Sequence, residues 1–486
     1  QRRADRPGGG RARGPAPGIG ADLSGGSASA TLALLAAGLP GVPGTVYGTP
    51  GTSAGERLLA VTFNDLTLDP LSGREAELER ARSIAENPRL HHVVVAAGEE
   101  ALPYAGPDGG PLADGPLTDE PGPSLVVAER HRRRLAAGSA DHLSGYGARE
   151  VLDAHPARLA DLLLDRRRRH LLRPVTALAK AEGATGRSVL VPLTVYRAAR
   201  RLARTPYRDG VLETARRLRE RDVTGSGAGA GAWGTGGAWG AGRAGGAGGA
   251  AHEAGAGVLD ASLSALAWCR PGPAARWLTG EVLAEVSIRL EQAALRPLPG
   301  ESGTRPGERR ARAALARLAA DHRILEQAAE VRSQRLHAPF LDNQVVRACR
   351  ALPEALRVQP GARAAVLRAV LAGAGVHELP PGWGTPSRAT HTTAARTGLR
   401  SRVGDLIDLF DAPLLADAGL VEARVVRKAL RAAAEGESLP LDGLAELVST
   451  EVWLRRLLAR RGSCWTGTAT ERRRAVAGGV PQRPSL

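Results

Sequence analysis

The stretch "ADLSGGSASATLALLAAG", residues 21–38, decides how the chain is expected to fold. A Ser-Gly-Gly turn stands between a short apolar run and an apolar helical pattern, so it predicts a turn from a strand into a helix. The two glycines lack the Cβ atoms that would block an oxyanion, and glycine adopts the positive φ that such turns need. The backbone N–H groups of Ser24, Gly25 and Gly26 would then face an anion at the helix N-terminus, with the hydroxyl of Ser29 beside them.

Strands and helices are expected to alternate in the first part of the chain. The runs "TVYGTP" at 45–50 and "HHVVVAAG" at 91–98 are typical of short buried strands, and helical patterns at 29–38 and 72–86 separate them. This alternation predicts right-handed crossovers and a parallel sheet, so the expected fold class is α/β. Ligands bind beyond the carboxyl ends of such strands, where Tyr47 would stand near the Ser-Gly-Gly turn.

A second glycine turn follows in "DHLSGYGARE", residues 141–150, at the end of a further expected strand. From about residue 150 the apolar spacing is mostly helical, and the Gly/Ala-rich insert cannot bury enough surface to order itself. The predicted organisation is a flexible lead-in at 1–17, a nucleotide-binding α/β core with its first helices at 18–223, a disordered insert at 224–257, a helical remainder of the same domain at 258–465 and a loose tail at 466–486.

Composition excludes several classes of protein. The formal net charge of +16 comes almost wholly from arginine, because Lys180 and Lys428 are the only lysines among the 486 residues. The arginines are spread over many helical stretches, which indicates solvated helix faces rather than a specific nucleic-acid site. Cys269, Cys349 and Cys464 have no zinc or disulfide spacing. No apolar run reaches the roughly 18 to 20 residues of a membrane span, so a cytoplasmic location is expected.

Four motifs in a fixed order strengthen the first glycine turn, which alone is a weak signal. They are "LSGGSAS", "LSGYGARE", "HAPFLDNQVVRAC" at 337–349 and "EVWLRRLLA" at 451–459. Together they resemble the synthetase domain of the asparagine synthetase family. Within that family, "TDEPGPSLVV" at 118–127, "YGAREVLDAHPARLADLL" and "RLHAPFLDN" are similar to the branch that closes the macrolactam ring of lasso peptides.

The resemblance implies an ATP pyrophosphatase-type α/β domain continued by a mostly helical region. Such a domain adenylates a carboxylate and lets an amine displace AMP, and the implied cofactors are ATP and Mg²⁺. The family motifs S-G-G-x-D-S and S-G-E-G-x-D-E carry over to the two glycine turns. With Tyr47 from the strand argument, the expected nucleotide-binding residues are Ser24, Gly25, Gly26, Ser29, Tyr47, Ser144, Gly145 and Gly147.

The chain departs from the family pattern at the positions that should carry charge. Ala28 and Arg149 stand where the family has its two metal-associated aspartates, so no residue is assigned as a metal ligand and weak or altered Mg²⁺ binding is expected. Glu150 keeps the acid that follows, and Arg388 in "PSRATHTTAARTGLR" replaces the family's catalytic lysine. These two are the expected catalytic residues, although a guanidinium lacks the compact geometry of an ammonium.

Several other positions have ordinary structural interpretations. Ala364 stands at a further basic position of the family, with Arg363 as a neighbouring substitute. Asp342 follows an apolar turn, as helix N-caps do. His91 and His92 lack further ligands at metal spacing and are expected at a strand end. The tryptophans expected to anchor the core are Trp268, Trp277, Trp383 and Trp453.

Three functions are open at this point. The first is a lasso peptide macrolactam synthetase, whose partners are a precursor peptide and other peptide-maturation proteins. The second is a glutamine-hydrolysing asparagine synthetase without its glutaminase domain, since Gln1 is not the cysteine nucleophile with which that domain begins. The third is an inactive relative that binds a peptide or a partner protein, which the loss of both aspartates favours.

Overall fold

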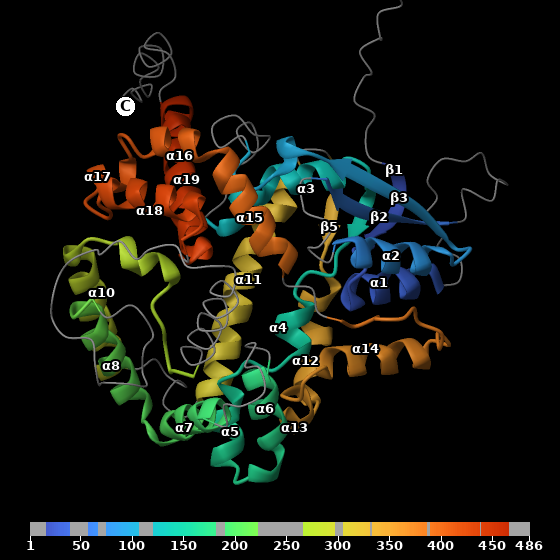
Figure 1. Cartoon of the computed structure of the whole chain (residues 1–486), viewed down its shortest axis with the longest axis horizontal. Helices are drawn as coiled ribbons and strands as arrows, with labels where there is room; N and C mark the ends of the chain where they lie inside the picture. Colours follow the sequence, from blue (N-terminus) through green and yellow to red (C-terminus); the bar gives the residue numbers. More distant parts are fainter. Residues whose placement is uncertain are drawn as a thin grey trace, which may run out of the picture.

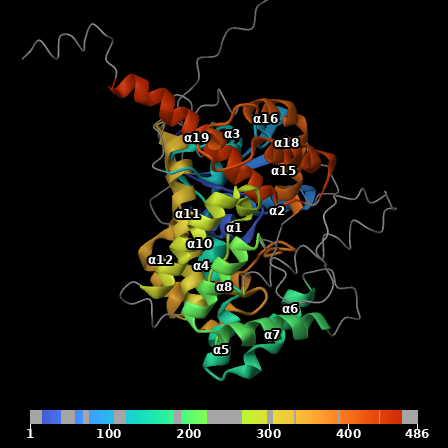
Figure 2. The ribbon, with the colours of Figure 1, turned by 90° about the vertical axis from the view of Figure 1, so that its left-hand side faces the viewer.

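The structure is a computed structural model, shown in two views in Figures 1 and 2. A parallel sheet lies at one side of the molecule, and helices make up most of the rest. The residues that the structure describes are 16–38, 57–66, 74–105, 120–180, 190–221, 266–296, 305–330, 333–385, 389–437 and 439–465. The expected strand at 45–50, the insert at 224–257 and the tail at 466–486 lie outside these residues.

Five parallel strands form the sheet in the order β3-β2-β1-β4-β5. The first strand lies at the centre, and the chain builds outward from it first to β2 and β3 and later to β4 and β5. The strand order therefore reverses between β1 and β4, where ligands bind in folds of this kind. The strands are β1 Ala16–Asp22, β2 Leu58–Asp65, β3 Leu90–Ala97, β4 Ser139–Leu143 and β5 Arg335–His337.

The parallel α/β fold class is confirmed, but two strands were not predicted. One is β2, whose run "LLAVTF" is apolar apart from Thr62 and largely buried, as expected of a parallel strand covered on both faces. The other is β5, which has only three residues in a region read as helical. A further difference is that β1 begins at Ala16, inside the segment expected to be a flexible lead-in.

Helices cover both faces of the sheet. In Figure 1, α1 and α2 lie on one side of the strands and α3 on the other, as right-handed crossovers require when the strand order reverses. The core between α1, the central strands and α14 contains the buried side chains of Leu23, Leu34 and Leu371. The helices near the sheet are α1 Ser27–Gly38, α2 Arg74–Ala85, α3 Ala128–Leu135, α4 Ala148–Leu152, α12 Asn343–Ala351, α13 Glu354–Arg357 and α14 Ala362–Gly373.

Two helical groups with their own apolar clusters extend from the sheet. One cluster joins α5, α6 and α7, and the other joins the C-terminal helices around Phe410 and Leu430. The long α11 runs between them (Figure 1). These helices are α5 Arg158–Leu164, α6 Leu172–Lys180, α7 Leu190–Arg204, α8 Tyr207–Arg219, α10 Gly280–Leu295, α11 Pro306–Glu330, α15 Ala389–Ser401, α16 Val403–Leu409, α17 Leu414–Asp417, α18 Ala423–Glu435 and α19 Leu441–Trp465.

The expected structural roles of single residues can be checked against these elements. Trp268, Trp277 and Trp383 are buried, while Trp453 is only half-buried. Asp342 is the N-cap of α12, where its carboxylate accepts a hydrogen bond from the N–H of Gln344 at 2.7 Å. In the described part of the chain, no helix combines the length and apolar character needed to cross a membrane.

Candidate functional site

The Ser24–Gly26 turn joins the end of β1 to the start of α1. Gly25 has a φ of +76°, and a Cβ atom there would collide with the carbonyl oxygen of Glu77, so the position requires glycine. The N–H of Ser24 donates to Oγ of Ser29 at 3.1 Å, and that hydroxyl in turn donates to the carbonyl of Gly26 at 3.2 Å. Ser29 therefore holds the turn in shape, while the first N–H groups of α1 have no acceptor within the helix.

The second glycine turn lies directly against the first. Ser144 continues β4, and its N–H donates to the carbonyl of His337 at 2.8 Å. A Cβ atom on Gly145 would lie 3.0 Å from the backbone nitrogen of Ser29, so the backbones of the two turns approach as closely as glycine allows. Gly147 lies two residues further along the chain and is the N-cap of α4. The structure thus brings the two predicted turns together at the reversal point of the sheet.

A cavity of about 430 Å³ opens beside the two turns. Val61 and Phe63 from β2, with Leu325, give it an apolar side. The turns contribute small polar groups and N–H donors on the other side. Both the size and the mixed lining fit a nucleotide-sized ligand. The cavity-lining residues from the turns are Ser24, Gly26, Ser27, Ala28, Ser29, Ser144, Gly145 and Tyr146.

Two buried ion pairs form the charged wall of this cavity. Asp22 binds Arg134 at 3.2 Å and lies 3.1 Å from Nε2 of His142. Asp65, the last residue of β2, binds Arg130 at 2.7 Å. These carboxylates were not predicted as site residues, although each ends an apolar strand run and could have been recognised from that position.

Arg130 has a second contact, which helps to orient its guanidinium group. Its guanidinium lies 4.6 Å from the centroid of the Phe63 ring, which is cation–π distance. Burial lowers the pKa of Arg130, while the attraction of Asp65 opposes that change. Arg74 also lines the cavity and donates to the backbone carbonyl of Asp65. The wall therefore holds guanidinium groups in defined positions, most of them already next to an acid.

The residues that differ from the family motifs, or that follow such a residue, lie in different places in the structure. Ala28 lines the cavity, so a carboxylate is missing from the wall itself. Arg149 is exposed on α4 and does not line the cavity, and Glu150 beside it is half-buried and does not line it either. Arg149 is thus wrongly placed to replace a metal ion at this wall. Arg388 and Tyr47 lie outside the described residues.

Arg363 is the basic residue from the family comparison that does line the cavity. Its guanidinium binds Asp153 at 3.1 Å. The neighbouring Ala364 packs instead against the apolar core around α1. A positive charge is therefore retained at the cavity, displaced by one residue along α14.

The donor set does not fit a Mg²⁺ ion. Across the residues that can be described, no group of three or more His, Cys, Asp or Glu side chains is arranged to hold a metal. Three carboxylates line the cavity, those of Asp22, Asp65 and Glu77, and the first two are already bound by arginines. Mg²⁺ prefers several oxygen ligands in octahedral geometry, and two of these three acids are occupied by arginines in its place.

A family model described as asparagine synthase matches residues 16–455, from the first residue of β1 into α19. The chain belongs to the asparagine synthase family. This family consists of ATP-dependent synthetases that form amide bonds, and the cavity lies at the reversal of the strand order, where open α/β sheets bind ligands. No curated protein matches the chain. The match covers the glycine turns, the cavity and both helical groups, so it applies to the described fold as a whole.

Proposed function

We propose that the chain is a lasso peptide macrolactam synthetase. In the proposed reaction, an Asp or Glu carboxylate of a precursor peptide attacks the α-phosphorus of ATP and pyrophosphate leaves. The peptide's own N-terminal amine then attacks the acyl-adenylate carbonyl, AMP leaves with the bonding electrons, and the amine gives up a proton as the amide forms. Membership of an amide-forming family and the three branch-like segments quoted above support this proposal.

The observation that carries the proposal is the contact of the two glycine turns around one cavity. In it the triphosphate would lie against the first N–H groups of α1 and the Ser144–Gly145 turn, because helix N-termini favour anions. The adenine ring would lie on Val61 and Phe63, which form the apolar side. Arg74 supplies a positive charge near the phosphates, and Arg388 remains the proposed substitute for the catalytic lysine.

ATP is the proposed cofactor, held with little dependence on Mg²⁺. The N–H donors of the turns are intact, whereas Ala28 contributes no carboxylate and the buried acids Asp22 and Asp65 are paired with arginines. Glu150 and Tyr47 keep their proposed catalytic and nucleotide-side roles. Metal-linked chemistry is not assigned to any residue of the described cavity.

A second candidate function is a protein without synthetase activity that binds a peptide or a partner protein. The specific observation in its favour is Ala28, which leaves the cavity wall without the carboxylate that the family uses there. This candidate keeps the cavity of the synthetase but does not require ATP to be cleaved in it. The two therefore differ in whether bound ATP is cleaved.

The test uses the full chain, ATP and a synthetic peptide with a free N-terminal amine and an internal Glu side chain. Release of pyrophosphate and AMP, with loss of one water from the peptide by mass spectrometry, is the expected result. An N-acetylated copy of the peptide is the matched control, since it can be adenylated but has no amine to close the ring. ATP binding without pyrophosphate release, or no ATP binding at all, would overturn the synthetase and favour the binding protein.

A further inference from the structure

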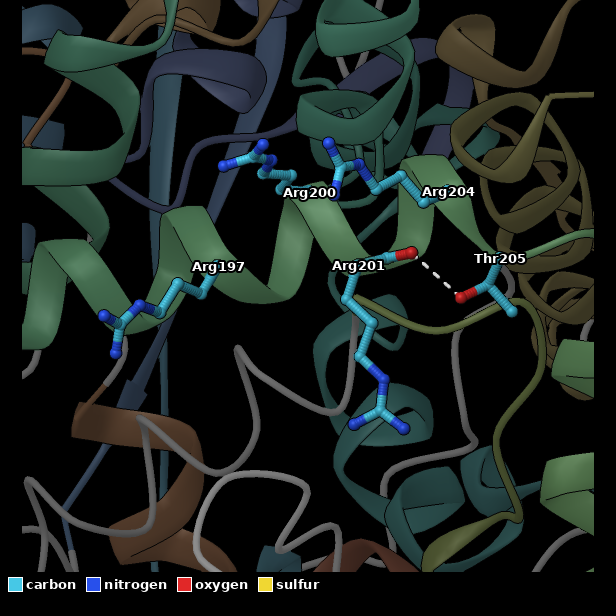
Figure 3. Close-up of a pocket in the computed structure, with 5 residues that line it drawn as sticks. All are labelled: Arg197, Arg200, Arg201, Arg204 and Thr205. Atoms are coloured by element: carbon cyan, nitrogen blue, oxygen red, sulfur yellow. Dashed lines mark hydrogen bonds between the residues drawn. The ribbon is translucent and has the colours of Figure 1, made fainter.

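One face of α7 carries four exposed arginines. Figure 3 shows Arg197, Arg200, Arg201 and Arg204 on this helix around an open hollow of about 400 Å³, which Thr205 completes. At 100° per residue these four positions fall within an arc of about 100°, so they form one stripe. We name these four residues the arginine face.

The opposite side of α7 holds the helix in place. Val195, Ala199 and Leu202 are buried there in the apolar cluster shared with α5 and α6. At the C-terminal end, Nε1 of Trp268 donates to the carbonyl of Thr205 at 2.7 Å, which closes the last turn. The arginine face is therefore presented by a helix that is packed along its length.

Among the described residues, the arginine face has no acidic partners. The sequence of α7 contains no Asp or Glu, and within the described parts of the chain none of its four guanidinium groups forms an ion pair. On neighbouring α8, by contrast, Arg216 and Arg217 bind Glu213 at 2.9 Å. Pairs of residues four apart also occur elsewhere, as Arg289 with Glu285 and Arg312 with Glu308.

Helix stability does not explain this arrangement. Like charges four residues apart, as in Arg197 with Arg201 and Arg200 with Arg204, each cost an isolated helix about 0.2–0.5 kcal/mol. The helix dipole favours cations in the last turn, which accounts for Arg201 and Arg204 alone. Arg197 lies in the middle of the helix, so its exposure beside other cations has no such compensation.

We propose that the arginine face binds an acidic peptide segment in extended conformation. Along the helix, residues four apart rise by about 6 Å, and side chains on one side of an extended peptide recur every ~6.6–6.8 Å. Alternate Asp or Glu carboxylates can therefore meet successive guanidinium groups, each pair with charge-assisted hydrogen bonds. None of the five residues around the hollow is aromatic, so bases of a single-stranded nucleic acid would find no aromatic ring to stack on there.

This site is separate from the nucleotide cavity. In both views α7 lies with α5 and α6 at the end of the molecule away from the sheet (Figures 1 and 2). Peptide binding there needs neither ATP nor an intact cavity. The inference therefore stands or falls independently of the proposed synthetase function.

The test measures fluorescence anisotropy of a short labelled peptide of alternating Glu and Ser with the full chain, in the absence of nucleotide. Binding that weakens with salt is expected, and replacing all four arginines of the face by Gln should weaken it at least about tenfold. The matched control changes four paired surface arginines, Arg216, Arg219, Arg289 and Arg312, to Gln, which alters the net charge equally. Thermal unfolding monitors that both variants fold.

Each alternative outcome overturns the proposal in a defined way. Equal weakening in the control variant would mean that the peptide responds to the overall charge of +16 rather than to the arginine face. Equal binding of a Gln-Ser peptide would exclude carboxylate recognition. Tighter binding of a thymidine oligonucleotide of the same charge would assign the face to nucleic acid.

Discussion

Nε2 of His142 lies 3.1 Å from Oδ1 of Asp22, and this buried contact joins strands β4 and β1 directly behind the Ser24–Gly26 turn. Arg134 binds the other carboxylate oxygen of Asp22 at 3.2 Å. Burial alone would raise the pKa of Asp22, but Arg134 and His142 bring its pKa below the ordinary value. The ionised carboxylate is therefore the native form, and it positions Arg134 at the cavity wall.

Replacing Asp22 by Asn should lower the free energy of unfolding by about 3 kcal/mol at neutral pH, because Arg134 would be left without its charged partner. The folded pKa of Asp22 is depressed, so its contribution is present above the ordinary pKa of about 4 and is lost as pH falls through the folded pKa. The difference between native and variant protein should therefore shrink in acid. Urea unfolding at a series of pH values measures both effects.

Asp141 on the same strand provides the matched control for Asp22. Its carboxylate is more exposed and binds Arg335 at 2.6 Å on the surface, so Asp141→Asn should cost less than about 1 kcal/mol. If both variants lose the same free energy of unfolding, the buried contact of Asp22 stabilises the fold no more than a surface ion pair does.

The Gly145→Ala substitution should weaken ATP binding about tenfold, because the new methyl group would press against the backbone nitrogen of Ser29 at 3.0 Å and displace the two turns. Isothermal titration with ATP measures the change. Gly404→Ala is the control, since a Cβ there meets no atom within 4 Å and alanine favours the helix. If the Gly145→Ala variant binds ATP with unchanged affinity, the close contact of the two turns does not contribute to nucleotide binding.

Restoring both family aspartates by Ala28→Asp with Arg149→Asp should create ATP binding that tightens at least about tenfold when Mg²⁺ is added. The Ala28→Asp change alone should produce most of this effect, because position 28 lines the cavity whereas position 149 does not. Isothermal titration with and without Mg²⁺ measures the dependence. The double variant Ala369→Asp with Arg350→Asp makes the same charge change at exposed positions away from the cavity and should show none.

A strong Mg²⁺ dependence in the unaltered chain would contradict the prediction that the native cavity holds ATP without the ion. It would also mean that carboxylates other than Asp22 and Asp65 supply the metal contacts, with Glu150 and the cavity-lining Glu77 as candidates. Titrations of the native chain, the two single variants and the double variant, each with and without Mg²⁺, together show which carboxylates cause the Mg²⁺ dependence of ATP binding.

The Glu451→Gln change should lower the free energy of unfolding by about 2–4 kcal/mol. Glu451 is fully buried in the motif "EVWLRRLLA" and accepts hydrogen bonds from the N–H groups of Leu414 and Leu415, both at 3.0 Å. It also binds Arg455 at 2.8 Å. In the Gln variant, these three donors would face a neutral amide in place of the negatively charged carboxylate. Thermal or urea unfolding tests this against Glu435→Gln, an exposed control expected to change stability by less than about 0.5 kcal/mol. A small effect at Glu451 would refute the structural role of the motif.

Local chemistry made part of the site predictable. The Ser-Gly-Gly turn needs the positive φ of Gly25 and ends at an apolar helix, so its residues alone determine a strand-to-helix turn. The N-cap role of Asp342 is predictable for the same reason, because the carboxylate bonds to an N–H two residues away. In each case the interacting groups are neighbours in the chain.

The sequence by itself therefore determined the parallel α/β class, the two glycine turns and the absence of carboxylates at positions 28 and 149. Tertiary structure alone decided that β2 and β5 complete the sheet, that Asp22 and Asp65 face the cavity with arginines, and that Arg149 does not. The physical reason is sequence distance: Asp65 and Arg130 are 65 residues apart, and Asp22 and His142 are 120 apart. Such partners are chosen by strand order and packing, which local patterns do not contain.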